Sequence, residues 1–338
     1  MDNTETVKVK KDSNVVMKTI AKYPILPTLA CFILMLVIFS VLSPQNKAGG
    51  NIFLSPVNLA NIVEATAAFS IGAFATVLVL LTGCIDLSIE PVIALSGIVY
   101  ALCSMAGLPF ILCLIVTLAM GVLCGLINSL LVIKFNVPPF LATVAVAMVY
   151  TGFAYLFSDG RVILINDPTL IRVFGSLGSG ATFLGLPVLL WWTIALMFVM
   201  YLVVSRSKFG RWAQATGGNI QAAHSSGVNV NLTRVIGYVV MGLFAAIIGL
   251  ILSARLSSAS PAYGSGYSLK LIIAAVLGGT SFTGDGGSMF GALLGSLVMG
   301  VLTNGLGIIG VSIYVQQVIT GIVIVMAVVF SIYLSRKK

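Results

Sequence analysis

Two long runs without a charged residue constrain the fold of this chain more than any other feature. Gly286–Ser335 extends for 50 residues and Pro91–Ile133 for 43 residues. A helix needs about 20 apolar residues to cross the hydrocarbon core of a bilayer, so each run is long enough for two crossings. Charged residues make up 8% of the chain and hydrophobic residues 59%, whereas an ordinary soluble domain contains about 25% charged residues. The sequence therefore predicts an integral membrane protein without a sizeable soluble domain.

The pattern of uncharged segments predicts an all-α membrane protein with about ten transmembrane helices. The expected spans are Tyr23–Asn46, Asn58–Leu81, two helices in Pro91–Ile133 broken near Gly107–Pro109, a helix from Pro138-Pro139 to Phe157, Leu186–Ser205, Val235–Ala254, a helix from near Tyr267 to Gly279, and two helices in Gly286–Ser335 broken near Gly305–Gly310. We expect a basic tail over residues 1–24, a single transmembrane domain over 25–334, and a basic tail over 335–338.

The distribution of the 18 lysines and arginines predicts the orientation of these spans. Ten crossings place both termini on the same side. If that side is the cytoplasm, 13 basic residues lie inside and 5 lie outside, as the bias toward cytoplasmic basic residues requires. This orientation places the hydrophilic loop 206–233 in the cytoplasm. No dense basic stripe suggests a nucleic-acid partner.

Several kinds of catalytic and cofactor chemistry find no support in the sequence. The five cysteines form no C-x-x-C pair and the single histidine, His224, lies far from them in sequence, so neither a zinc site nor a disulfide framework is indicated. No paired carboxylates supply a general acid and base. No phosphate-binding loop motif and no Gly-Lys dipeptide occur. We therefore expect no enzyme activity, no metal and no cofactor, and any ATP that drives this protein must bind another chain.

Two turns resemble each other. In both Leu81–Ser88 and Leu277–Gly287, an apolar run ends in glycine and an aspartate follows a few residues later. Both turns face the same side of the membrane in the ten-helix arrangement. Backbone broken at glycine inside a membrane protein usually lines a cavity or packs against protein, because lipid cannot satisfy its polar groups.

A series of short motifs carries a resemblance to a known family. They are TGCIDLS at 82–88, VPPFLAT at 137–143, GGN at 217–219, AA at 222–223, SGVNV at 226–230, RLSSA at 255–259, AAVLGGTS at 274–281, NGL at 304–306 and GV at 310–311. In order and spacing, from about residue 58 to the C-terminus, the chain resembles the permease subunits of bacterial ABC importers for ribose and other simple sugars. It departs from that family at Gln221 and His224, where Glu and Arg are usual, at Cys84, and at Glu90-Pro91.

The resemblance implies a subunit of the bacterial cytoplasmic (inner) membrane with several partners. These are a second copy of the permease or a paralogue, cytoplasmic ATP-binding subunits, an extracytoplasmic substrate-binding protein and a small sugar, with membrane lipid around the spans. The sequence leaves open which sugar is carried and whether the two permeases are identical.

The cytoplasmic loop holds the expected coupling site for the ATP-binding subunits. Its candidate residues are Gly217, Gly218, Asn219, Gln221, Ala222, Ala223 and Gly227. The sequence predicts a short helix over Gln221–Ser226 that ends at Gly227, and such a helix suits force transmission to a partner. The alternative is a solvated loop whose basic residues only set the topology.

Polar residues within or beside the spans are the candidates for a translocation path. They are Glu64, Gly83, Asp86, Asn128, Asn304 and Gln316. Uncharged amides can hydrogen-bond sugar hydroxyls, and they add no charge that would retain the sugar. We expect the path to run between two permeases. For each residue the alternative is packing, since interhelical hydrogen bonds of about 0.6 kcal/mol are common in membrane proteins, and Glu64 alternatively lies at the membrane interface.

A self-sufficient, ion-coupled secondary transporter is the alternative function. That mechanism needs an acidic residue or a histidine in the middle of a helix. Only Glu64 approaches this requirement.

Overall fold

The computed structural model describes residues 25–175, 182–281, 284 and 286–335. The basic tails, residues 1–24 and 336–338, lie outside the described residues, as does Asp285 of the second turn. Helices dominate. The elements are α2 (Leu26–Leu42), α3 (Pro56–Leu81), α4 (Ile89–Met105), α5 (Phe110–Ile133), α6 (Pro139–Ser158), β1 (Ile163–Leu164), α7 (Pro168–Phe174), β2 (Thr182–Phe183), β3 (Leu186–Pro187), α8 (Val188–Tyr201), a π-helical extension η2 (Leu202–Arg206), α9 (Lys208–Gly218), α10 (Ile220–Ser225), α11 (Val230–Leu256), β4 (Ser258–Ala259), α12 (Tyr267–Leu277), α13 (Met289–Ile308) and α14 (Ile313–Ser335).

The expected class, an all-α membrane protein, is confirmed. Six helices are long and apolar enough to cross a bilayer, namely α3, α5, α6, α8 with η2, α11 and α13. The apolar helices α2, α4, α12 and the stretch Ile313–Val323 of α14 are shorter. The breaks expected near Gly107–Pro109 and Gly305–Gly310 are present, since α4 ends at Met105 and α13 ends at Ile308. The number of crossings and the side of the termini remain predictions.

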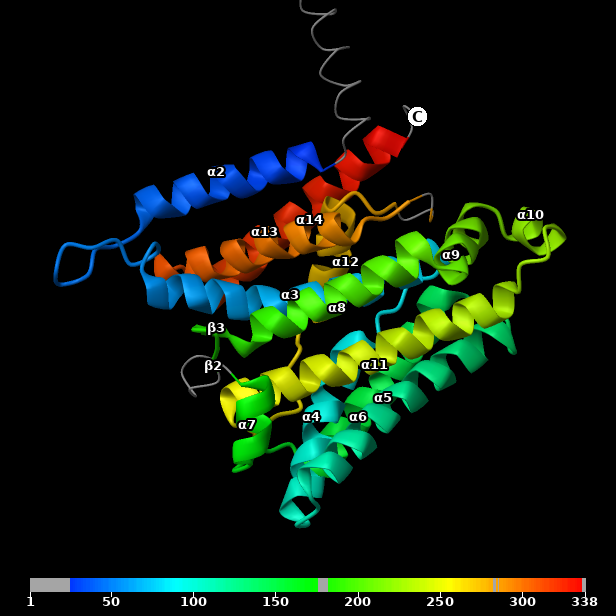
Figure 1. Cartoon of the computed structure of the whole chain (residues 1–338), viewed down its shortest axis with the longest axis horizontal. Helices are drawn as coiled ribbons and strands as arrows, with labels where there is room; N and C mark the ends of the chain where they lie inside the picture. Colours follow the sequence, from blue (N-terminus) through cyan, green and yellow to red (C-terminus); the bar gives the residue numbers. More distant parts are fainter. Residues whose placement is uncertain (1–24, 176–181, 282–283, 285, 336–338) are drawn as a thin grey trace, which may run out of the picture.

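Helix α3 runs through the centre of the molecule (Figure 1), with α2, α13 and α14 on one side and α4, α5, α6 and α11 on the other. It packs against α8, α11, α12 and α13. In its most apolar 18-residue stretch 89% of the residues are buried, compared with 28% in α5 and in α6 and 22% in α8 with η2. The peripheral helices α5, α6 and α8 therefore carry more exposed apolar surface than α3 does.

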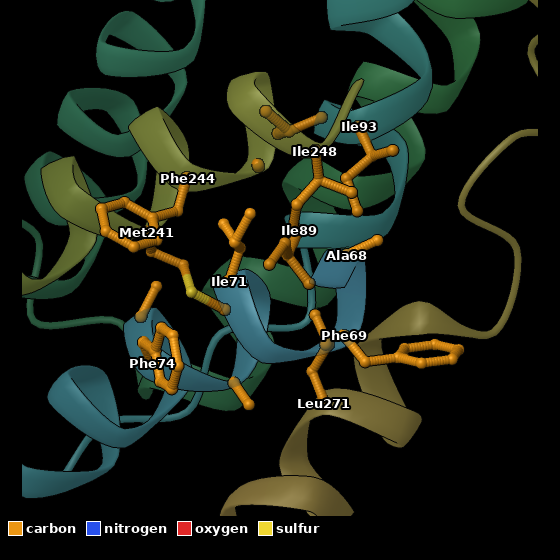
Figure 2. Close-up of a cluster of buried hydrophobic side chains, with 14 of the residues drawn as sticks. Ala68, Phe69, Ile71, Phe74, Ile89, Ile93, Met241, Phe244, Ile248 and Leu271 are labelled. Atoms are coloured by element: carbon orange, nitrogen blue, oxygen red, sulfur yellow. The ribbon is translucent and has the colours of Figure 1, made fainter. Parts of the chain in front are cut away.

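Apolar side chains from four helices meet around α3. Figure 2 shows Ile71 and Phe74 of α3 facing Met241, Phe244 and Ile248 of α11, with Ile89 and Ile93 of α4 and Leu271 of α12 beside them. Burying each side chain of this size contributes about 1.5–3 kcal/mol in water. In a bilayer the lipid is equally apolar, so close packing decides which helices associate.

Small residues allow α5 and α11 to approach each other closely. A Cβ added at Gly242 of α11 would lie 2.1 Å from the carbonyl oxygen of Gly121 on α5, and one at Gly125 would lie 2.3 Å from the carbonyl oxygen of Tyr238. A side chain at any of these positions would force the two backbones apart. This tight contact fixes the position of α5 relative to α11, and therefore the position of Asn128, which lies on α5.

The two ends of the bundle differ. One end carries α9, α10 and the start of α11, and we call it the α10 end. The opposite end carries the 43–55 segment, α7 and a short antiparallel pairing of β1 with β4, Ile163 opposite Ala259. In the predicted orientation the α10 end faces the cytoplasm.

Candidate functional site

The expected short helix of the coupling loop is present as α10. Asn219 begins it, because its side-chain Oδ1 accepts a hydrogen bond of 2.9 Å from the backbone N–H of Ala222. Gly227 follows the helix at a φ of +79°, a conformation that glycine adopts without strain. Asn219 therefore caps the N-terminus of α10, and Gly227 forms part of the turn after its C-terminus.

The exposed face of α10 differs from the expected one. Ala223 was expected to form a docking surface with Ala222, but Ala223 is 3% exposed and packs against the protein. The exposed side chains of α10 are Ile220, at 46%, together with Gln221, Ala222, His224 and Ser225. A six-residue helix that lies on the bundle must turn one side inward, and Ala223 is on that side.

A second helix in the loop was not expected from the sequence. Helix α9 spans Lys208–Gly218, and the Ser207 hydroxyl caps its N-terminus by accepting a hydrogen bond of 3.1 Å from the Gly210 N–H. The segment contains three glycines and few apolar residues, so its sequence does not show the usual pattern of a helix. The capping serine was the available signal, because serine before a helical segment is a common start.

Gly217, at the end of α9, lies between the two similar turns. A Cβ added to Gly217 would be 2.4 Å from the carbonyl oxygen of Leu81 and 2.9 Å from Cα of Gly284. A Cβ on Gly83 would lie 3.4 Å from Cα of Gly217. The expectation that both turns face the same side is thus confirmed, and we call Gly83, Gly217 and Gly284 the glycine junction. It connects α9 to the α3–α4 and α12–α13 turns through backbone contacts.

Asp86 and Asn128, two of the expected path residues, are brought together inside the protein. Asp86 Oδ1 accepts hydrogen bonds of 2.7 Å from both the backbone N–H and the hydroxyl of Ser88. Asn128 Nδ2 donates to the Ser88 hydroxyl at 2.6 Å and to Asp86 Oδ2 at 3.2 Å. The Tyr150 hydroxyl donates to Asn128 Oδ1 at 3.1 Å. Asp86, Ser88 and Asn128 are each at most 4% exposed, so this network fixes the 82–88 segment to α5 and α6.

Glu64 lies inside α3, 3% exposed, and its Oε2 is 3.5 Å from Nε of Arg255 in the last turn of α11. Glu64 is therefore buried within the protein, and its depth relative to the membrane interface stays a prediction. Arg255 was not expected at the site, because its contact with Glu64 spans almost 200 residues of sequence.

The remaining candidates, Asn304 and Gln316, lie apart from this group. Asn304 of α13 and Asn58 of α3 exchange two amide hydrogen bonds of 2.9 and 3.0 Å. Gln316 donates through Nε2 to the carbonyl oxygen of Val311 at 2.8 Å. Both arrangements match the packing alternative. Among the described residues, no group of three or more His, Cys, Asp or Glu side chains is placed to hold a metal ion.

Comparison with known proteins places this arrangement in a family. The model of the family described as "Branched-chain amino acid transport system / permease component" matches residues 58–328. The chain belongs to this permease family. No solved structure matches it.

Several curated permeases are similar over almost their whole length. The ribose import permease protein RbsC of Haemophilus influenzae is 36% identical over 307 residues, 91% of this chain and 94% of that protein. RbsC of Bacillus subtilis is 37% identical over 92% of both chains. The L-arabinose transport system permease protein AraH of Escherichia coli is 33% identical over 90% of this chain and 91% of that protein. The expected resemblance to simple-sugar importer permeases is confirmed, and the chain is a multi-pass membrane permease.

Proposed function

We propose that this permease is the membrane-spanning subunit of an ATP-driven importer for a monosaccharide such as ribose, or for a related small sugar. The observation that carries the proposal is the similarity to ribose import permeases over about nine-tenths of both chains. The subunit forms the translocation path and couples to separate ATPase subunits, since the chain has no phosphate-binding loop motif.

The partners follow from this role. A second copy of the chain or a paralogue completes the path, ATP-binding subunits dock at the α10 end, and a substrate-binding protein delivers sugar to the opposite end. An importer subunit of this kind occupies the bacterial cytoplasmic membrane with the α10 end inside.

Coupling passes through α10 in this proposal. Its exposed residues are Ile220, Gln221, Ala222, His224 and Ser225, and none of them is a Lys, Arg, Asp or Glu. A contact of this kind is held by shape and apolar packing and depends weakly on salt.

The glycine junction supplies the connection from α10 to the membrane. Helix α9 lies directly before α10, and Gly217 touches both turns by backbone alone. Among the described residues, the closest contacts of Gly217 with these turns are to backbone atoms, so no flexible side chain absorbs a displacement there. A movement of α9 therefore shifts the ends of α3 and α12 together.

The ion-coupled alternative is less well supported by the same geometry. Glu64, the acidic residue within α3, is paired with Arg255. The ion pair gives Glu64 a structural partner that links α3 to α11, whereas an ion-coupled transporter needs an acidic side chain that binds the coupling ion.

Reconstitution distinguishes the two functions. The purified permease is placed in proteoliposomes with its ATPase and its binding protein, and uptake of radiolabelled ribose and L-arabinose is measured. We expect uptake that requires ATP and all the subunits. Uptake that follows a proton or sodium gradient without ATP would instead establish the secondary transporter.

Two adjacent alanines test the coupling face. Ala222→Asp places a charge on the exposed side of α10, so we expect lost coupling or lost assembly with the ATPase while the membrane domain remains folded. Ala48→Asp, at an exposed position of the opposite end, is the control for assembly with the ATPase. Ala223→Asp instead buries the charge and should destabilise α10 itself. Normal assembly and transport in Ala222→Asp would place the coupling surface elsewhere.

A further inference from the structure

Helix α12 is a half-span that begins beside the middle of α3. The ring of Tyr267, its first residue, lies 5.0 Å from the ring of Phe69, the fourteenth of the 26 residues of α3. Four residues on, Leu271 packs against Gly72. At 1.5 Å per residue α3 is about 39 Å long and α12 only about 16 Å. Figure 2 shows Phe69 extending from α3 toward the helix that carries Leu271, away from Ile71. The non-helical stretch 260–266 therefore descends to mid-membrane depth.

The start of α4 meets the start of α12 at this depth. The Ser268 hydroxyl donates a hydrogen bond of 3.0 Å to the carbonyl oxygen of Leu87. A Cβ on Gly264 would lie 3.0 Å from the carbonyl oxygen of Glu90. Two helix N-termini, each with a partial positive charge, thus converge beside α3. Discontinuous helices that begin near the midplane are a common way for transporters to build a polar site for a solute.

Charged side chains gather around these helix starts. Glu64 pairs with Arg255, and the ammonium of Lys270 lies 5.9 Å from the ring centroid of Phe69. Glu90 occupies the first turn of α4 and interacts electrostatically with Lys270. Arg255 interacts in the same way with Tyr267. A charged side chain at the centre of a bilayer is unfavourable unless it faces protein or water. Lipid is therefore a poor environment for this group.

The surface beside these charges is also unsuited to lipid. Ala262, Ser265 and Gly266 of the non-helical stretch are exposed, and Leu269 of the first turn of α12 is 52% exposed. From Leu271 to Val276 the same helix is buried or nearly so. Irregular backbone at membrane depth is tolerated only where it is covered by protein or lines water.

We propose that this mid-membrane face, defined by Glu90, Arg255, Tyr267, Leu269 and Lys270, with the buried Glu64 as the partner of Arg255, lines the aqueous path taken by the sugar. The proposal rests on the proposed permease function. Two acidic and two basic side chains balance, so the face offers both donors and acceptors to hydroxyl groups without a net charge that would retain an ion. Tyr267 adds aromatic surface for the apolar side of a sugar ring, and the buried Phe69 packs against the Tyr267 ring.

Water access to Leu269 tests the path directly. Leu269→Cys and Leu123→Cys are made in a variant without native cysteines and assembled into the complete importer in membranes. Each is treated with a membrane-impermeant anionic methanethiosulfonate, both at rest and during ATP turnover. Leu123 is a matched control, since it lies near the middle of α5 and is 55% exposed. We expect Leu269→Cys to react at least tenfold faster in one of the two states. Equal rates, or no reaction at position 269 in either state, would overturn the proposal.

A charge-removal series separates this inference from the proposed function. Lys270→Met should reduce ribose uptake at least tenfold while assembly and basal ATP hydrolysis persist, and Lys270→Arg should restore uptake. Lys134→Met, at the end of α5, is the control. If wild-type complexes show no ATP-dependent uptake, the proposed function fails. If wild type transports and Lys270→Met transports equally well, only the path assignment fails. If Lys270→Met does not assemble, the labelling at position 269 still decides.

Discussion

Replacing Gly217 with alanine tests whether the glycine junction transmits motion. The added Cβ would lie 2.4 Å from the carbonyl oxygen of Leu81, whereas ordinary contacts begin at 3.4 Å. The backbones must therefore separate by about 1 Å, the difference of those two distances, and neither a rotamer change nor a flexible side chain can relieve the clash. Overpacking of this kind costs about 1–3 kcal/mol. We expect reversible unfolding in mixed micelles to show a loss of that size, and uptake per ATP hydrolysed to fall.

Gly152→Ala is the matched control for this prediction. Gly152 also lies in a helix, α6, but an added Cβ there meets nothing within 4 Å. Alanine is the better helix former by roughly 0.5–1 kcal/mol, so this variant should be at least as stable as wild type and fully coupled. If Gly217→Ala matches Gly152→Ala in both stability and uptake per ATP, the junction is not a rigid connection and the reasoning is wrong.

Three further predictions follow from individual contacts. A double-mutant cycle of Asn58→Ala and Asn304→Ala should give a coupling energy of about 0.6–1.7 kcal/mol, and a value near zero would contradict the amide pair. Asn128→Leu removes donors from buried Asp86 and should cost about 1–3 kcal/mol of stability, and an unchanged unfolding midpoint would show that the network is dispensable. For the orientation, a cysteine at Val162 should label from outside and one at Gln214 from inside, and the reverse pattern would refute the positive-inside assignment.

The helix pattern was available from the sequence because bilayer thickness fixes the length of an apolar run. Pro139 starts α6 where the Pro138-Pro139 pair predicted a start, and Tyr267 starts α12 as expected. Glycine turns ended α4 and α13 near the expected residues. What the sequence did not predict is that α12 begins beside the middle of α3, since hydropathy gives the length of an apolar run but not the position of its start relative to other helices.

The site was harder to predict, because its contacts join residues far apart in the chain. The motif around Gly217 marked the coupling loop, but only the packed structure shows that Ala223 faces inward and that Gly217 touches two turns. Asn304 and Gln316 were reasonable polar candidates, yet their amides bond to Asn58 and to Val311. A polar residue within a span indicates that some partner exists, and the sequence does not identify which one.

The sequence by itself determined the class of this protein, its helical segments and its family resemblance, since these depend on composition, local hydropathy and short motifs. Tertiary structure alone decided which faces meet. Close approach of glycine backbones set the junction at Gly217, and the mid-depth start of α12 brought Glu64, Arg255 and Lys270 to one face. The physical reason is that burial, charge balance and contact distance depend on positions in space, and these are fixed only when all the helices pack together.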